Sequence, residues 1–215
     1  MRAFFGWASE PGPEQLITYD PTRAVRRAKV RKKPPPRAQA DDLARILGQC
    51  EPRDRVLLLL LLQTGIRRGE AADARIEDYD RDRQRLYVRG KGSKERWVVV
   101  PEEAVRELEP YLAYLGRRSG PLFPSSHRPG QGLAPGTISH IVRQAGERAG
   151  ARLWTHLCRH TALSDAAENG ATAWELQAQA GHTYSSTTDA YVHISERSVE
   201  RAMAGRRYRG GRAQP

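Results

Sequence analysis

The longest apolar run in the chain is Val56–Leu62, a valine followed by an unbroken series of leucines. Charged residues precede this run and Gln63 follows it. Crossing a bilayer requires about 20 apolar residues, so the run is far too short for a membrane span. A short helix that is apolar around its whole circumference is instead buried in a protein interior. The sequence therefore predicts a fully buried helix over 53–63.

The positive charge of the chain limits the class of its partner. Lys and Arg number 36 against 25 Asp and Glu, which gives a formal net charge of +11. The length of 215 residues is typical of one domain, or of one domain with a fragment of another, and is sufficient for a core without disulfides or metals. A balance this basic indicates a polyanionic partner. Nucleic acid is the commonest one, and charge alone does not exclude an anionic membrane or an acidic protein.

The two cysteines, Cys50 and Cys158, are too few for a disulfide framework and favour a reducing compartment. The N-terminal residues contain no long apolar stretch and no cleavage site, so no signal peptide is expected. A cytoplasmic protein that does not enter a membrane is therefore expected.

Residues 1–10, with Phe4, Phe5 and Trp7, are typical of the end of a helix that has little sequence to pack against. Prolines interrupt 11–37 and oppose regular structure there. Eight basic residues and no acidic one lie between Arg23 and Arg37. This segment is interpreted as a basic linker, either as a solvated tail or as a strap along phosphates that releases counterions on binding.

From Ala38 onward the sequence predicts a mainly α-helical domain with a small antiparallel β-sheet, an α+β fold. A β-hairpin is expected from 85–89 and 96–100, which alternate or are β-branched and flank the Gly90–Ser93 turn. Thr172 and Glu175 form a capping box that opens a helix. Further helices are expected over 41–49, 53–63, 67–74, 102–115, 135–149, 155–169 and 195–204.

Two segments carry basic side chains next to glycines. Arg67 follows Gly65 near a helix N-terminus, which is itself an anion site, although an arginine there is usually solvated. Lys91 and Lys94 lie at or beside the hairpin tip, where a lysine commonly has no role beyond the turn. A lysine removed from water has a lowered pKa, which also suits it to give a proton to a leaving oxygen.

Two further segments carry imidazoles. His156 and Arg159 share one face of the predicted helix over 155–169, and a Gly-His pair at His182 precedes Tyr191 by nine residues. Cys158 and His160 raise the alternative of a zinc site. That alternative is disfavoured because Cys158 points away from the face shared by the histidines and Arg159 would repel a cation. No metal and no cofactor are expected.

Five segments of the chain resemble motifs of the tyrosine recombinases of the phage integrase family, those similar to Xer and lambda integrase, and they occur in that family's order. The segments are Thr-Gly-x-Arg-x-x-Glu, Gly-Lys-Gly-x-Lys, His-x-x-Arg-His, Gly-His and Thr-Thr-x-x-Tyr-x-His. The resemblance runs from about residue 1 to 204. It implies the catalytic-domain fold of that family and cleavage and rejoining of DNA strands at specific sites. It also implies that neither a metal nor a nucleotide takes part.

The resemblance further implies a role for each residue. Arg67 and Arg159 would clamp the scissile phosphate, and planar guanidinium forks suit two phosphate oxygens. Tyr191 would attack the phosphorus and become a 3′-phosphotyrosine. The remaining implied roles are proton donation to the 5′ oxygen by Lys91, assistance in proton transfer and phosphate binding by His156, a hydrogen bond to the phosphate from His182, and support by Glu70 and His160. The density of basic charge separately predicts DNA contacts from Arg31, Lys32, Lys33 and Lys94.

The expected domain organisation follows from the same resemblance. Residues 1–37 resemble only the last helix of the family's N-terminal core-binding domain and the linker after it, 38–204 the catalytic domain, and 205–215 a basic tail. The expected partners are double-stranded DNA and further copies of the chain in a tetramer on paired sites. Relaxation of supercoils by type IB topoisomerase-like chemistry and a non-catalytic DNA-binding remnant remain as alternatives.

Overall fold

The computed structural model describes residues 1–25, 36–90 and 94–181. Backbone contacts divide the chain into two compact units, 1–33 and 34–215. In the smaller unit, helix α1 (Arg2–Ala8) is followed by turns, and the amides of Leu16 and Ile17 both donate to the Ala8 carbonyl, at 3.0 and 3.1 Å. Phe4 and Trp7 are about half exposed. The helical structure expected within 1–10 is therefore confirmed.

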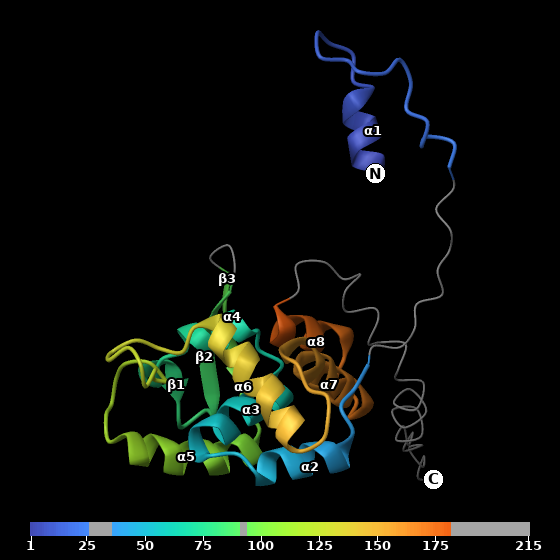
Figure 1. The fold of residues 1–215 in the computed structure, drawn as a ribbon. Helices are drawn as coiled ribbons and strands as arrows, with labels where there is room; N and C mark the ends of the chain where they lie inside the picture. Colours follow the sequence, from blue (N-terminus) through green and yellow to red (C-terminus); the bar gives the residue numbers. More distant parts are fainter. Residues whose placement is uncertain (26–35, 91–93, 182–215) are drawn as a thin grey trace, which may run out of the picture. The chain divides into compact units, whose positions relative to one another are not determined.

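The core of the larger unit is built around α3 (Pro52–Thr64). Pro52 starts this helix at a position that needs no backbone donor, and Gly65, with φ of 68°, ends it. Every residue of Val56–Leu62 is at most 5% exposed, as predicted for a helix buried on all sides. The helix packs mainly against α7 (Thr155–Glu168) and α5 (Glu102–Leu115), and Figure 1 shows it in the interior of the helical group.

A three-stranded antiparallel sheet consists of β1 (Tyr79–Asp80), β2 (Arg85–Gly90) and β3 (Lys94–Val99), in that order. In the β2–β3 hairpin, Leu86 pairs with Val98 and Gly90 with Lys94. Leu86, Val88 and Val98 face the core. Helix α4 (Arg68–Asp73) packs against β2, and the 3₁₀ turn Ile76–Asp78 leads from α4 into β1.

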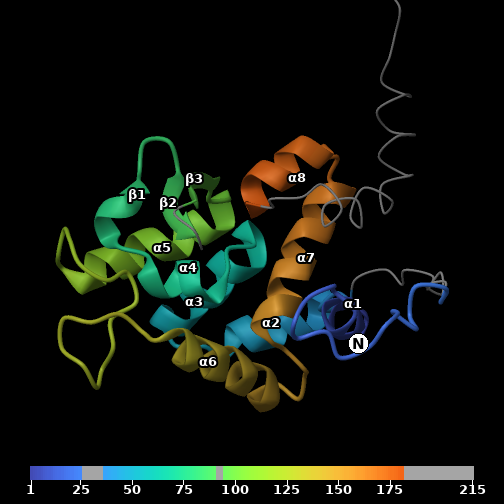
Figure 2. The ribbon, with the colours of Figure 1, turned by 90° about the horizontal axis from the view of Figure 1, so that it is seen from above.

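The remaining helices enclose this centre. They are α2 (Ala40–Gly48), α6 (Pro135–Arg148) and α8 (Ala173–Ala180). Figure 2 shows α7 running from beside α2 toward α8, whose last turn contacts β3. The capping box predicted at Thr172 and Glu175 begins α8, and Gly181 ends it with φ of 62°.

The mainly α-helical fold with a small antiparallel sheet is confirmed. The predicted helices agree with α2 to α7 to within one or two residues at each end, and Arg67 proves to be the N-cap of α4 rather than its first residue. Within the described ranges, no helix is long and apolar enough to cross a membrane. The helix predicted over 195–204 lies outside the described residues.

Candidate active site

Arg67 is held at the N-terminus of α4 by the carboxylate of Glu70, one turn further on. The Arg67 backbone N–H donates to Glu70 Oε2 at 2.8 Å, and its guanidinium Nη1 donates to Oε1 at 2.9 Å. Its second terminal nitrogen, Nη2, lies 3.3 Å from the Gly181 carbonyl oxygen. These hydrogen bonds fix the orientation of the Arg67 side chain, which is still 41% exposed to solvent.

Arg159 lies on α7 and is far more enclosed, with 7% of the residue exposed. Its Nη2 donates to the Ala180 carbonyl at 2.7 Å, and its Nη1 donates to the carbonyl of Gly65. Gly65 is the left-handed residue that ends α3. The guanidinium of Arg159 is therefore oriented by two segments, the turn before Arg67 and the end of α8.

Glu70 is almost completely buried and receives a second guanidinium, that of Arg96 on β3. Arg96 Nη1 and Nη2 donate to Oε1 and Oε2 of Glu70 at 2.8 and 3.0 Å, a parallel two-bond fork. Burial alone would raise the pKa of Glu70. The hydrogen bonds from Arg96 and from the Arg67 backbone, together with the charge of Arg96, instead hold that pKa below its ordinary value. Glu70 is therefore an ionised, buried link between Arg67 and Arg96.

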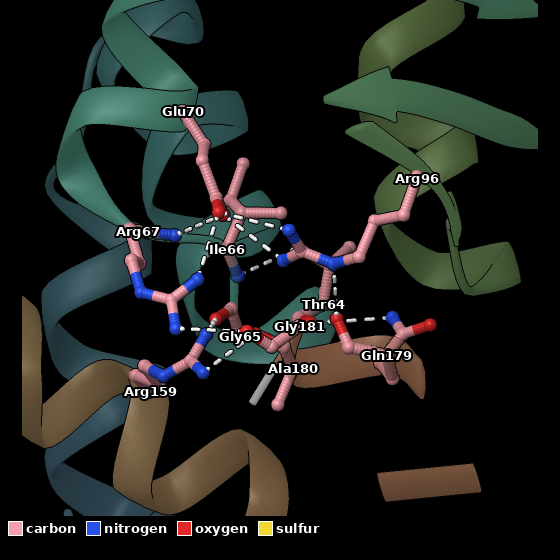
Figure 3. A network of polar contacts seen from close by, with 10 residues as sticks. All are labelled: Thr64, Gly65, Ile66, Arg67, Glu70, Arg96, Arg159, Gln179, Ala180 and Gly181. Atoms are coloured by element: carbon pink, nitrogen blue, oxygen red, sulfur yellow. Dashed lines mark hydrogen bonds and ion pairs between the residues drawn. The ribbon is translucent and has the colours of Figure 1, made fainter. Parts of the chain in front are cut away.

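Three arginines meet three consecutive carbonyls at the end of α8 (Figure 3). The carbonyls of Gln179, Ala180 and Gly181 accept from Arg96, Arg159 and Arg67 respectively. The last carbonyls of a helix lack intrahelical partners and carry partial negative charge, so cations are favoured there. The backbone directly before His182 is thus bound to both arginines of the predicted phosphate site.

A cavity of about 390 Å³ is lined by Arg67 and Arg159. The first turn of α4, Arg67, Arg159, His156 and Gly90 at the end of β2 all line it. Arg89 also lines this cavity and is fixed by a fork to Asp78, with bonds of 2.6 and 2.7 Å. The cavity is therefore rich in cationic donors and is bordered by the residue that precedes Lys91.

The histidines of α7 lie one turn apart, with ring centroids of His156 and His160 separated by 6.5 Å. Burial, followed by the nearby His156 and Arg159, lowers the pKa of His160, which favours its neutral form near pH 7.

Cys158 faces the core, and burial raises the pKa of its thiol to about 12, so it remains a protonated packing residue. Within the described part of the chain, no three His, Cys, Asp or Glu side chains gather as metal ligands.

The structure brings together four of the residues predicted from sequence: Arg67, Glu70, His156 and Arg159. Lys91, His182 and Tyr191 lie outside the described residues, as do Arg31, Lys32 and Lys33, and only the backbone of Lys94 is described. Sequence reasoning missed Arg96. Alternation of side chains along the hairpin strand could have identified it, because Arg96 falls on the same face as the buried Val98 and Val100.

The fold agrees with the comparisons to known proteins. The chain belongs to the phage integrase family, whose model matches residues 36–198. It is 32% identical to the tyrosine recombinase XerD of Pseudomonas putida over 98% of this chain and 74% of that protein. It is 31% identical to the tyrosine recombinase XerA of Pyrococcus furiosus, over 75% of this chain and 57% of that one.

A crystal structure of XerA recombinase has the same fold. Its TM-score to this chain is 0.68 at 26% sequence identity, and the superposition covers 83% of this chain and 68% of that one. The chain spans somewhat more than half the length of several of the curated relatives that it matches.

Proposed function

We propose that this protein is a site-specific DNA recombinase that cleaves and rejoins DNA strands through a 3′-phosphotyrosine intermediate. One observation carries the proposal. Arg67 and Arg159, which lie 92 positions apart in the sequence, line one cavity. Gly90, which precedes Lys91, lines the same cavity, and Gly181, which precedes His182, accepts a hydrogen bond from Arg67. Membership of the phage integrase family and relatives named tyrosine recombinases support the same activity.

The proposed chemistry is a transesterification at phosphorus. Extra negative charge develops on the phosphoryl oxygens in the transition state, and fixed guanidinium donors stabilise it. The Tyr191 oxygen forms the new bond to phosphorus while His156 assists removal of the phenol proton. The bond from phosphorus to the 5′ oxygen breaks, and Lys91 gives that oxygen a proton. Attack of a 5′ hydroxyl on the phosphotyrosine reverses these steps and reseals a strand.

The arginines have a second use in this scheme. A free tyrosine has a pKa near 10, so only about 0.1% of it is phenolate at pH 7. Two guanidinium charges beside the phosphate lower the pKa of an approaching phenol. The orientation of Arg67 by Glu70 and of Arg159 by the Gly65 carbonyl means that these charges need not rearrange during the reaction.

The proposed partner is double-stranded DNA, with the basic residues Arg31, Lys32, Lys33 and Lys94 at its phosphates. A tetramer on paired sites and a cytoplasmic location belong to the same proposal, as does the division into 1–37, a catalytic domain over 38–204 and a basic tail over 205–215. The net charge of +11 supports a polyanionic partner.

Covalent trapping tests the proposal. The full chain is incubated with a library of nicked suicide duplexes, and DNA that stays attached in denaturing detergent is sequenced. Wild-type protein should give an adduct, Tyr191→Phe should give none, and Tyr114→Phe, a change at a tyrosine that is 84% exposed on α5, should behave as wild type. Equal adduct from Tyr191→Phe would remove Tyr191 from its role. A two-site plasmid then separates recombination from simple relaxation of supercoils.

A further inference from the structure

Arg96 is a strongly enclosed arginine for which the proposed chemistry has no use. We propose that Arg96 is a positioning residue of the strand-cleavage reaction, holding the end of α8 and the Glu70–Arg67 pair in one arrangement. This inference rests on the proposed function. It assigns to the hairpin strand β3 a part in orienting the phosphate site, in addition to carrying the hairpin tip.

The guanidinium of Arg96 uses all three of its nitrogens. Two bind the Glu70 carboxylate, and Nε donates to the Gln179 carbonyl at 2.9 Å. Its side chain is only 14% exposed. Figure 3 shows it entering from β3, between Glu70 and the end of α8. A single rigid group therefore ties together three segments that are far apart in the sequence.

Gln179 reinforces the same junction. Its side-chain amide donates to the carbonyls of Thr64 and Val99, both at 3.2 Å, and its Oε1 accepts from the Val99 N–H at 3.3 Å. The amide thus pairs with the outer edge of β3 much as a neighbouring strand would. Through Arg96 and Gln179, the end of α8 is attached to β3 by both backbone and side chain.

These attachments lead directly to the phosphate site. The Glu70 carboxylate that binds Arg96 also orients Arg67. The two carbonyls that follow Gln179, those of Ala180 and Gly181, accept hydrogen bonds from Arg159 and Arg67. Loss of Arg96 would leave Glu70 with one guanidinium partner and would release the first of the three carbonyls. Both effects shift Arg67 and the start of the segment that carries His182.

Gly181 supplies an independent sign of how closely Arg96 fits. A Cβ at this position would lie 2.8 Å from Arg96 Nη1 and 2.9 Å from Cζ. The backbone at the end of α8 therefore passes against the face of the guanidinium with no room for a side chain. Lysine cannot reproduce the arrangement, because one ammonium cannot form a planar fork and also reach the Gln179 carbonyl in the geometry of Nε.

The experiment compares Arg96→Met and Arg96→Lys with Arg106→Met, which removes an exposed arginine from an ion pair on α5. Each variant is measured for DNA affinity without cleavage, for single-turnover adduct formation at saturating protein, and for thermal unfolding. At a temperature where all are folded, Arg96→Met should bind DNA with unchanged affinity but form adduct roughly 10- to 100-fold more slowly, the effect of a misplacement of about 1 Å. Arg96→Lys should recover thermal stability more than rate.

A double variant identifies the route. If Arg96 acts through Glu70, the Arg96→Met, Glu70→Gln protein should be no slower than the slower single variant. Rates equal to wild type for Arg96→Met, or a slower rate that is matched by weaker DNA binding, would overturn the positioning role.

Hydrogen exchange at the amides of 176–181 supplies a readout that does not depend on activity. Exchange there should accelerate in Arg96→Met and not in Arg106→Met, while exchange in α6 should stay unchanged. Unaltered exchange over 176–181 would refute the inference even if the wild-type protein formed no adduct. Accelerated exchange with no wild-type adduct would instead refute the proposed function and leave the attachment of α8 to Arg96 intact.

Discussion

Arg159 Nη2 and the carbonyl oxygen of Ala180 lie 2.7 Å apart, so the enclosed arginine of α7 is hydrogen-bonded to the last residue of α8. A buried guanidinium that also binds the Gly65 carbonyl has a single orientation in the fold. The strand-cleaving chemistry proposed for this chain depends on that orientation, since a preformed donor is more effective than one that must rearrange.

Arg159→Lys should therefore remove most of the cleavage activity although the charge is kept. One ammonium cannot bind both carbonyls and still present a fork to two phosphate oxygens, so we expect adduct formation to slow by about 10²- to 10³-fold. Single-turnover trapping measures the rate, and Arg106→Lys, at an exposed position of α5, serves as the matched control. A rate within a factor of two or so of wild type, with the fold intact by circular dichroism, would show that Arg159 does not act on the phosphate.

Glu70 should make the stability of the protein depend on pH in a defined direction. Its pKa in the folded state is lower than the ordinary value of 4.5, so the ionised group stabilises the fold above that pH. The contribution is lost as pH falls through the lower, folded-state value. Glu70→Gln should lower the free energy of unfolding by about 3 kcal/mol at pH 7, because it leaves buried arginine charge unpaired.

The difference in unfolding free energy between wild type and Glu70→Gln should shrink as pH falls below about 4.5, when followed by urea unfolding. Glu102→Gln is the control, because Glu102 forms a solvent-screened, exposed pair with Arg106 that contributes little to stability. A difference that stays constant down to pH 3 would contradict the ionised, stabilising state of Glu70.

Gly181→Ala and Gly116→Ala form a matched pair of substitutions. Both glycines end a helix with φ of 62°, so alanine carries the same backbone strain at each, about 1–2 kcal/mol. Around Gly116 no atom lies within 4 Å of an added Cβ, whereas at Gly181 the Cβ meets the Arg96 guanidinium. Thermal unfolding should show a larger loss of stability for Gly181→Ala, and only that variant should also slow adduct formation. Equal destabilisation by the two variants would argue against a close approach of Gly181 to Arg96.

The basic linker should be detectable in the salt dependence of DNA binding. Replacing Arg31, Lys32 and Lys33 with alanine should reduce the slope of log affinity against log salt by up to about 3, close to 0.9 for each phosphate that is no longer neutralised. The control replaces Arg81, Arg83 and Arg106, three exposed arginines that carry the same total charge. If both triple variants change the slope equally, the linker has no specific place along the phosphates.

Periodicity and capping residues were enough to predict most helices of this fold. The leucine run identified α3, and the Thr172–Glu175 box identified the start of α8. These signals are local, so they can be read without the tertiary structure. Strand β1 was missed because its two residues, Tyr79 and Asp80, are too few for any alternation to be recognised.

The site could be predicted only in part. Arg67, His156 and Arg159 stood out because their motifs match a family in order, but Arg96 belongs to none of those motifs. Its function follows from a partner 26 positions earlier, Glu70, and from a backbone carbonyl 83 positions later, at Gln179. Long-range pairs of this kind are set by packing, which a single sequence does not display. The roles of Lys91, His182 and Tyr191 remain predictions.

Helix α3 has a consequence for how this protein is made. Its main partner is α7, which ends at Glu168, about 100 residues after the leucine run. At the usual pace of translation, roughly 5–20 residues per second, α7 leaves the ribosome about 5–20 s after the leucines. During this interval the apolar segment of the nascent chain lacks its main partner, so the yield of the protein in the cell should depend on chaperones that bind such segments.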